Sequence, residues 1–155
     1  MLSFMAKEHG ITYLPLCVLI DAYTFHMADL KNRKILWEFE DDSRGGAFFS
    51  SPAVSEKVVI AGSRDGFLYC LDKKTGTKKW SFKALDEIDS SPVITKGKVL
   101  TASIDGRIYL LNIETGEKIW SYEIGASISS SPAVLDGLVV IGADDGRIYT
   151  FEDAR

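Results

Sequence analysis

The side chains with the most reactive chemistry in this chain are few and scattered. The two cysteines, Cys17 and Cys70, each lie inside an apolar run, and their spacing matches neither a metal site nor a disulfide framework. The two histidines, His9 and His26, have no serine near them with the spacing of an activated nucleophile. Glycine-rich phosphate-binding motifs are absent as well. We therefore expect no catalytic residue, no metal site and no enzymatic activity.

The carboxylates are more numerous, and the most conspicuous of them recur at a fixed interval. Asp65, Asp105 and Asp145 are each followed by glycine, and they are evenly spaced along the chain. An Asp-Gly pair favours a tight turn, because aspartate bonds nearby backbone amides and glycine adopts the positive φ that the turn needs. The turn glycines are Gly66, Gly106 and Gly146.

The same interval governs other markers in the sequence. Ser-Ser-Pro begins at residues 50, 90 and 130, Thr-Gly at 75 and 115, and tryptophan follows at 80 and 120. Within one copy, the runs "FFSSPAV", "KVVIAGS", "FLYCLD" and "KKWSFK" read as four short strands separated by turns. Four strands in each copy of about 40 residues, with no helical period, predict an all-β protein whose antiparallel sheets are the blades of a β-propeller.

We expect about four blades in this chain. The predicted repeats are residues 2–42, which are degenerate, then 47–85, 87–125 and 127–155, of which the last is incomplete. They form one predicted propeller domain over residues 1–155, which is either complete in itself or a fragment or half of a larger propeller.

The segments "YCLDKKTGTKKW" (residues 69–80) and "YLLNIETGEKIW" (residues 109–120) resemble the tryptophan-docking motif of the pyrroloquinoline-quinone (PQQ) repeat. Leu110 and Asn112 depart from that motif, and Asn32-Arg33 stands in place of Thr-Gly in the first repeat. The resemblance implies that each tryptophan packs against the neighbouring blade. The residues that it assigns to this structural docking are Trp37, Trp80, Trp120, Gly76, Gly116, Asp72, Thr75 and Thr115.

Propellers of this kind include outer-membrane assembly lipoproteins, which bind proteins, and quinoprotein dehydrogenases. The resemblance to the dehydrogenases implies a vicinal disulfide, a stacking tryptophan and a bound calcium ion. This chain has no Cys-Cys pair, and its three tryptophans all occupy docking positions. We therefore expect no cofactor, and a non-catalytic scaffold module that mediates protein–protein interaction. The alternatives are a fragment of a quinoprotein dehydrogenase or another ligand-binding propeller, and a sensor domain of a larger receptor or kinase.

The predicted fold places two further groups of side chains together. The turns between the second and third strands share a face with the linkers between blades, which suggests an acidic binding face made of Asp65, Asp86, Glu87, Asp89, Asp105, Asp144 and Asp145. Turn chemistry and solubility explain these residues more simply. The first strand of each blade lines the central channel, which makes candidate channel-lining residues of Ser50, Ser51, Ser90, Ser91, Ser130 and Ser131. Small side chains are expected there because the blades converge at the axis.

The net charge and the apolar segments limit which partners and which cellular compartment we expect. A net charge of −4 over 155 residues gives no electrostatic reason to expect a nucleic-acid partner. The apolar run "LPLCVLI" (residues 14–20) is too short to span a bilayer, and no clear signal peptide precedes it. A cytoplasmic location is the default expectation, and a periplasmic or extracellular one is the alternative if the chain is a fragment of an exported protein.

The repeats also raise the question of how the ring closes. The last copy stops before its outermost strand, and "LSFMAK" (residues 2–7) resembles the outer strand "WSFKAL" (residues 80–85). Open blade edges invite pairing, so we expect two chains to join head to tail in an eight-bladed homodimeric ring. The alternatives are a closed four-bladed monomer and a fragment that missing sequence completes.

Overall fold

The computed structural model describes residues 16–20, 23–40 and 46–152. Every regular element in this part of the chain is a β-strand. β-branched and aromatic residues dominate the strands, and the turns between them carry glycine, asparagine, aspartate or serine, as strand and turn propensities require. The prediction of an all-β propeller is confirmed.

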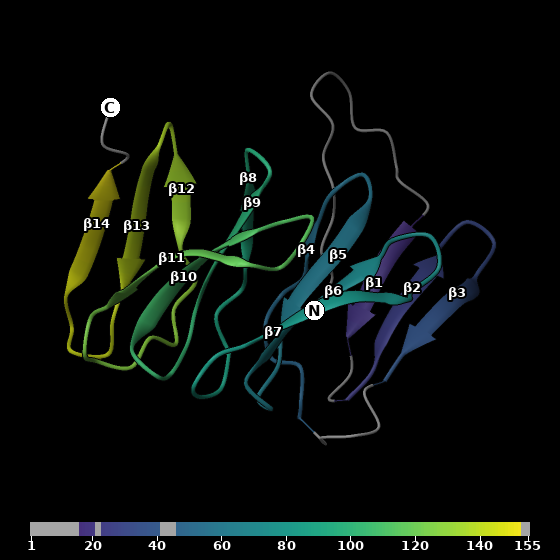
Figure 1. Cartoon of the computed structure of the whole chain (residues 1–155). Coiled ribbons are helices and arrows are strands. Elements are labelled where there is room, and N and C mark those ends of the chain that lie inside the picture. Colours follow the sequence, from purple (N-terminus) through teal and green to yellow (C-terminus); the bar gives the residue numbers. More distant parts are fainter. Residues whose placement is uncertain (1–15, 21–22, 41–45, 153–155) are drawn as a thin grey trace.

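The strands form four antiparallel sheets, which we name blades A to D in chain order (Figure 1). Blade A contains β1 (Leu16–Ile20), β2 (Phe25–Asp29) and β3 (Lys34–Phe39); blade B contains β4 (Ala53–Val54), β5 (Val58–Gly62), β6 (Phe67–Asp72) and β7 (Lys78–Lys83). Blade C contains β8 (Val93–Thr95), β9 (Lys98–Ala102), β10 (Arg107–Asn112) and β11 (Lys118–Glu123); blade D contains β12 (Ala133–Leu135), β13 (Leu138–Gly142) and β14 (Ile148–Glu152). In each blade every strand pairs with the next one along the chain.

The sequence repeat is preserved in the strand register. Cys70 pairs with Trp80 in blade B and Leu110 pairs with Trp120 in blade C, and a register shift follows directly after each pair. Corresponding residues are therefore separated by one repeat interval between blades B and C, and again between blades C and D. This correspondence lets one blade serve as the reference for another.

The hydrophobic core lies between the blades, which stand side by side in an arc (Figure 1). Side chains from blades A and B form one buried cluster around Tyr69, those of blades B and C form a second around Tyr109, and those of blades C and D form a third around Ile141. Each internal blade thus buries one face against its predecessor and the other against its successor. The faces at the two ends of the arc lack one of these neighbours among the described residues.

The two end blades have three strands each in the described part of the chain. Within that part, blade D has no outermost strand after β14, which confirms the prediction of an incomplete last copy. Among the described residues, blade A begins at its second strand, because its β1, β2 and β3 correspond to β5, β6 and β7 of blade B. The segment of residues 2–7 that resembles an outer strand, like His9, lies outside the described residues. No helix in the described ranges is long and apolar enough to cross a membrane.

Candidate functional site

The Asp-Gly turns are locked by a contact that repeats in three blades. The Asp65 carboxylate accepts hydrogen bonds from the Phe67 amide at 2.9 Å and from the Tyr69 hydroxyl at 2.5 Å. Asp105 accepts the same two bonds from the amide two positions later and the tyrosine hydroxyl four positions later. Asp145 accepts the corresponding pair in blade D. Each following glycine has a φ near +80°, which a residue with a side chain rarely adopts.

The tyrosine in this contact was missed in the sequence, although its signal was present. Tyr69, Tyr109 and Tyr149 each follow a turn aspartate by four residues, and they recur at the repeat interval. Burial raises the pKa of Tyr109, and the hydrogen bond to Asp105 raises it further. Tyr109 therefore remains a neutral donor. Three of the seven carboxylates of the suggested acidic face accept hydrogen bonds from their own blades.

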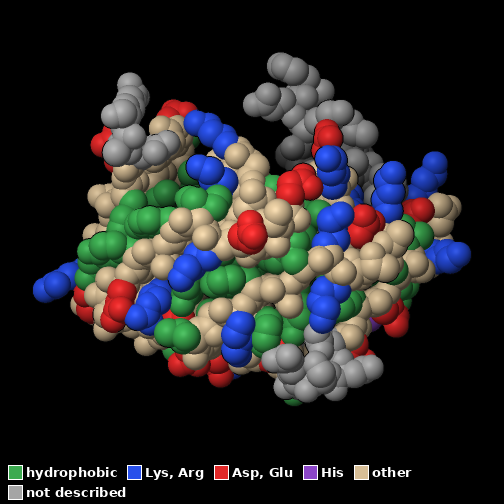
Figure 2. Space-filling model, viewed as in Figure 1, with side chains coloured by type: hydrophobic (Ala, Val, Ile, Leu, Met, Phe, Trp, Pro, Cys, Tyr) green, Lys and Arg blue, Asp and Glu red, His purple; other side chains and the backbone are tan. Residues whose placement is uncertain are grey.

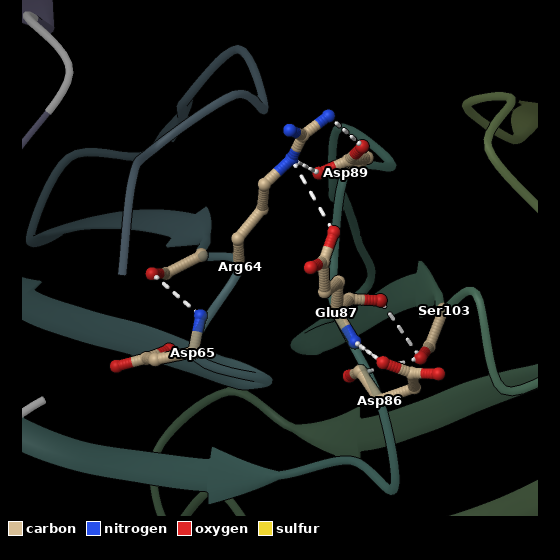
Figure 3. A network of polar contacts seen from close by, with 7 residues as sticks. Arg64, Asp65, Asp86, Glu87, Asp89 and Ser103 are labelled. Atoms are coloured by element: carbon tan, nitrogen blue, oxygen red, sulfur yellow. Dashed lines mark hydrogen bonds and ion pairs between the residues drawn. The ribbon is translucent and has the colours of Figure 1, made fainter. Parts of the chain in front are cut away.

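The remaining carboxylates of that face are also engaged by neighbouring groups. Arg64 of blade B forms a bidentate contact with Asp89, with distances of 2.9 and 2.8 Å, and lies 3.4 Å from a carboxylate oxygen of Glu87 (Figure 3). Asp86 accepts a hydrogen bond from the amide of the next residue, and Asp144 accepts one from the hydroxyl of Ser129. The carboxylates of this face therefore make contacts within the turns and with the linkers between blades.

The paired serines divide into two structural roles. The hydroxyl of Ser50 is buried, and it accepts a hydrogen bond from the Gly62 amide at 2.7 Å and donates one to the Gly62 carbonyl at 3.0 Å. Ser130 makes the corresponding bond to Gly142, whereas the buried hydroxyl of Ser90 has no hydrogen-bond partner among the described residues.

The second serine of each pair links neighbouring blades. The amide of Ser51 donates to the Ser91 hydroxyl, and the amide of Ser91 donates to the Ser131 hydroxyl, at 2.8 and 2.9 Å. Each bond joins equivalent positions of successive repeats, so these serines form a ladder from blade to blade. The hydroxyls of Ser91 and Ser131 are occupied as acceptors in it.

The first two tryptophans lie against a glycine of the next blade. The Trp37 ring contacts Gly76, where an added Cβ would lie 2.6 Å from the ring, and the Trp37 indole nitrogen donates a hydrogen bond to the Lys73 carbonyl at 2.9 Å. Trp80 repeats this arrangement on Gly116 and the Ile113 carbonyl. Each tryptophan therefore fixes the turn that precedes the outer strand of its neighbour.

These turns are held by their own side chains. Asp72 accepts hydrogen bonds from the amides of Thr75 and Lys74, which lower the pKa of Asp72 below its ordinary value of 3.8. Asn112 accepts the same two bonds in blade C, from the amides of Glu114 and Thr115. The departure from the repeat motif at Asn112 thus leaves the turn intact.

Trp120 occupies the third such position, but its surroundings differ. Its ring is 39% exposed, compared with 8% for Trp37, and it contacts the ring of Phe151 with centroids 5.7 Å apart. The residues that correspond to Lys73 and Gly76 would be Asp153, which lies outside the described residues, and position 156, which follows the last residue of the sequence. A groove of about 560 Å³ lies beside the ring, between blades C and D.

The residues that the structure describes do not fit the quinone cofactor of the dehydrogenase propellers. The rings of Trp37 and Trp80 are packed between blades with their indole nitrogens bonded. Cys70 is a buried free thiol, and burial raises its pKa to about 12. No group of three or more metal-ligating side chains occurs in the described ranges.

We call the face of blade D that points away from blade C its outer face. Side chains on this face are more exposed than the corresponding side chains of the other blades. Leu138 and Ile148 are 40% and 75% exposed, whereas the corresponding residues of blade B, Val58 and Leu68, are 5% and 0% exposed. The difference arises because blade C covers that face of blade B, and no described blade covers blade D. Figure 2 shows hydrophobic side chains gathered at this end of the arc.

Comparison with known proteins extends these observations. Residues 86–155, somewhat less than half of the chain, match the family model described as outer membrane protein assembly factor BamB. No curated protein sequence matches the chain. The crystal structure of BamB from Moraxella catarrhalis has a TM-score of 0.78 and 20% sequence identity, and the match covers 89% of this chain and 43% of that one.

Two further structures show the same fold. The computationally designed Ika4 protein has a TM-score of 0.79 at 19% identity, and the match covers 98% of this chain and 96% of the designed one. A europium-containing methanol dehydrogenase has a TM-score of 0.62 at 21% identity, with coverage of 74% and 23%. The chain thus spans less than half of the natural proteins that it resembles. The matched residues and the shared fold show a β-propeller whose repeats are similar to those of the PQQ-like family.

Proposed function

We propose that the chain is a non-catalytic propeller module that binds polypeptide partners, with the uncovered outer face of blade D as its principal binding surface. The observation that carries this proposal is the exposure of Ile148, at 75%, where the corresponding Leu68 and Ile108 of the two preceding blades are fully buried. The same position is apolar in all three blades, although only blades B and C have a described neighbour that covers it.

The energetics favour association through this face. Burying a large aliphatic side chain contributes about 1.5–3 kcal/mol relative to leaving it exposed. Leu138 and Ile148 both gain this contribution when a partner covers blade D, and the edge of β14 that has no ladder partner among the described residues adds backbone groups that a partner strand can pair. A surface of this kind suits another blade better than it suits a small polar ligand.

A second copy of the chain is the partner that we propose for this surface. At each junction from blade A to blade D, one blade already packs its outer face against the facing side of the next blade along the chain. An arc of this length makes up nearly the whole of the designed Ika4 chain and less than half of the BamB chain. Two arcs joined head to tail would repeat the same junction twice around a two-fold axis.

The absence of catalysis is part of the proposal and is supported by the use of the carboxylates. Asp65, Asp105 and Asp145 are each held by a tyrosine hydroxyl and a backbone amide. A general acid or base needs a free position toward a substrate, and these groups use their acceptors in the turn. The likeness to BamB, an outer membrane protein assembly factor, points in the same direction.

Light scattering over a range of concentrations tests the proposal. We expect the mass to rise from the 17.1 kDa of one chain toward twice that value, and we expect Ile148→Glu to keep the chain at the single-chain mass. Ile119→Glu is the matched control, because Ile119 is 50% exposed on the outer strand of blade C, away from the end face. A single-chain mass at all concentrations, with a cooperative melt, would contradict the second copy as partner.

Quinone binding would contradict the non-catalytic part of the proposal. Titration of the Trp120→Leu variant with PQQ and calcium should leave the remaining tryptophan fluorescence unchanged, because Trp37 and Trp80 are packed between blades. Saturable quenching at micromolar PQQ, together with dye-linked alcohol oxidation, would favour the dehydrogenase alternative.

A further inference from the structure

The linker between β7 and β8 carries side chains that its counterpart between β11 and β12 lacks. We call residues 84–89, with the sequence ALDEID, the B–C linker, and residues 124–129, with the sequence IGASIS, the C–D linker. At the positions of Leu85, Asp86, Glu87 and Asp89, the C–D linker has glycine, alanine and two serines. The Leu85 side chain is 74% exposed. The B–C linker therefore presents an apolar side chain and three carboxylates where the C–D linker presents small neutral groups.

The fold does not require these side chains. In both linkers the amide of the first residue donates to the carbonyl of a turn glycine, at 2.9 Å in the B–C linker and 2.8 Å in the C–D linker. The carbonyl of the fourth residue accepts from an amide of the blade that follows, at 3.0 and 2.9 Å. Each linker also buries one isoleucine, Ile88 or Ile128. Because the C–D linker makes the same contacts without charge, turn chemistry alone does not account for the B–C linker.

A second exposed apolar side chain lies beside the B–C linker. Phe49 is 58% exposed, and the later repeats have Asp89 and Ser129 at its position. The Arg64 guanidinium lies over the Phe49 ring, with its central carbon 3.6 Å from the ring centroid. The same guanidinium contacts Asp89 and Glu87 (Figure 3). Arg64 therefore connects Phe49 to the B–C linker and orients the ring, and such preorganisation lowers the entropic cost of binding.

The charges around Arg64 do not balance. The three carboxylates of the B–C linker and the single guanidinium leave a net charge of −2. The side chain of Glu87 is 44% exposed and is therefore accessible to a partner. Complementary charges steer partners and suppress wrong ones, and aromatic and arginine side chains are enriched among the residues that contribute most to binding. This combination suits a partner that is both basic and apolar.

We infer that the B–C linker, together with Phe49 and Arg64, forms a docking site for a polypeptide segment that combines lysine or arginine with large apolar side chains. The basic side chains of the segment pair with Asp86 and Glu87, and its apolar side chains cover Phe49 and Leu85. Arg64 is a positioning residue that holds the Phe49 ring. The inference goes beyond the proposed function, because this site lies on the linker and not on the outer face of blade D.

Short synthetic peptides test the chemistry of the site. The probe is a fluorescently labelled peptide of eight residues in which lysine alternates with leucine. We expect saturable binding to the full chain by fluorescence anisotropy, and we expect the affinity to fall when NaCl is raised from about 50 to about 300 mM. A peptide of alternating lysine and serine should bind at least about tenfold more weakly, and one of alternating glutamate and leucine should not bind.

A variant that imitates the C–D linker locates the site. Leu85→Gly, Asp86→Ala and Glu87→Ser, combined in one chain, should weaken binding of the lysine–leucine peptide at least about tenfold. This chain should melt within about 4 °C of the original, because the C–D linker folds with the same three residues. The charge-matched control combines Glu114→Ser and Glu117→Ser, which removes two carboxylates from the turn at the other end of β10, and should change binding less than about twofold.

The apolar part of the site is tested separately. Phe49→Ser, which reproduces the residue found at position 129, should weaken binding at least about threefold without changing the net charge of the chain. Ile148→Glu should bind the peptide no more weakly than the original chain does. A single-chain mass at all concentrations would contradict the second copy as partner, but it would leave these peptide results unchanged.

Four outcomes overturn the inference. The first is the absence of saturable binding. The second is an equal loss of binding in the linker variant and in the charge-matched control, which would mean that the peptide responds only to net charge. The third is equal binding of the lysine–leucine and lysine–serine peptides, or full binding by Phe49→Ser. The fourth is loss of binding in Ile148→Glu, which would place the peptide on the outer face of blade D.

Discussion

The junction between blades B and C and the junction between blades C and D contain corresponding residues with different environments. Trp80 contacts Gly116 and donates a hydrogen bond to the Ile113 carbonyl, whereas Trp120 is 39% exposed beside an open groove. Both tryptophans occupy the same position of a nearly identical strand. The repeat therefore determines which side chains each blade presents to its neighbour, and the neighbour determines whether those side chains are buried or exposed.

The outer faces of blades B and D show the same relationship. Leu68 is fully buried beneath blade C, and Ile148 is 75% exposed at the corresponding position. The residue is apolar at both positions, although only blade B has a described neighbour that covers it. This comparison is the basis of the predictions below, which test whether the two junctions differ in the way that their contacts indicate.

The largest expected effect distinguishes the two tryptophans. Trp80→Ala should lower the free energy of unfolding by about 3–5 kcal/mol, because it leaves a cavity between blades B and C and removes the partly buried hydrogen bond to the Ile113 carbonyl. Trp120→Ala should lower it by no more than about 1 kcal/mol, as is usual for side chains that are substantially exposed. Urea denaturation of both variants measures the difference. Equal losses would mean that the C–D junction is as tightly packed as the B–C junction.

The glycine contact can be tested with a smaller change. Gly116→Ala places a Cβ 2.6 Å from the Trp80 ring, and φ at this position is +73°. We expect a loss of about 2–4 kcal/mol, from steric overlap and from the strained backbone together.

Gly125→Ala is the control that separates these two causes. Gly125 has a φ of +87° but no atom within 4 Å of an added Cβ, so this substitution should cost only the backbone strain of about 1–2 kcal/mol. If the two substitutions cost the same, then the close approach of Gly116 to Trp80 contributes nothing to stability.

Thr101 in blade C offers a stabilising substitution. Its side chain is fully buried, and its hydroxyl has no hydrogen-bond partner among the described residues; the corresponding positions in blades B and D carry Ala61 and Ile141. Thr101→Val removes an unsatisfied hydroxyl at nearly constant volume, so we expect a gain of about 1 kcal/mol. A loss of stability in thermal denaturation would indicate that the hydroxyl is satisfied in the folded protein, for example by a buried water.

The smallest effect is the dependence of stability on pH. Amide hydrogen bonds lower the pKa of Asp72 below 3.8 in the folded chain, and the Tyr149 hydroxyl and the Arg147 amide do the same for Asp145. A lowered pKa contributes stability above the unfolded value of 3.8, and this contribution is lost as the pH falls through the folded pKa. The Tm should therefore fall on acidification below about pH 4.

Asp72→Asn should reduce this acid-dependent loss while preserving the turn, because Asn112 makes the same two backbone contacts in blade C. An unchanged acid profile in Asp72→Asn would show that the Asp72 carboxylate makes no contribution to acid sensitivity.

Much of the fold could be predicted from the sequence, because its determinants are local and repeated. The fixed repeat interval, the alternating strands and the turn glycines specify blades whatever surrounds them. The packing of each tryptophan against the neighbouring blade was expected from a family resemblance, and nothing in the spacing alone shows that Trp80 and Gly116 meet across a blade junction.

The roles of the polar residues were harder to predict. An aspartate before glycine is typical of a turn or of an acidic face. Only the geometry shows that the Tyr69 hydroxyl donates a hydrogen bond to the Asp65 carboxylate. Both serines of each pair were assigned the same role from the sequence. The Ser50 hydroxyl instead accepts a hydrogen bond within its own blade, whereas the Ser91 hydroxyl accepts one from the preceding blade. Such differences depend on strand register at the axis, which the side-chain types do not encode.

Hydrogen exchange tests most directly whether the C-terminal end of the arc is an uncovered copy of an internal junction. At a concentration where the chain is single, the β14 amides and the Trp120 indole N–H should exchange at least about 100-fold faster than the β10 amides and the Trp80 indole N–H. Raising the concentration until chains associate should slow exchange in β14 and leave β10 unchanged. Equal protection of β14 and β10 in the single chain would contradict the account, because it would mean that blade D is already covered.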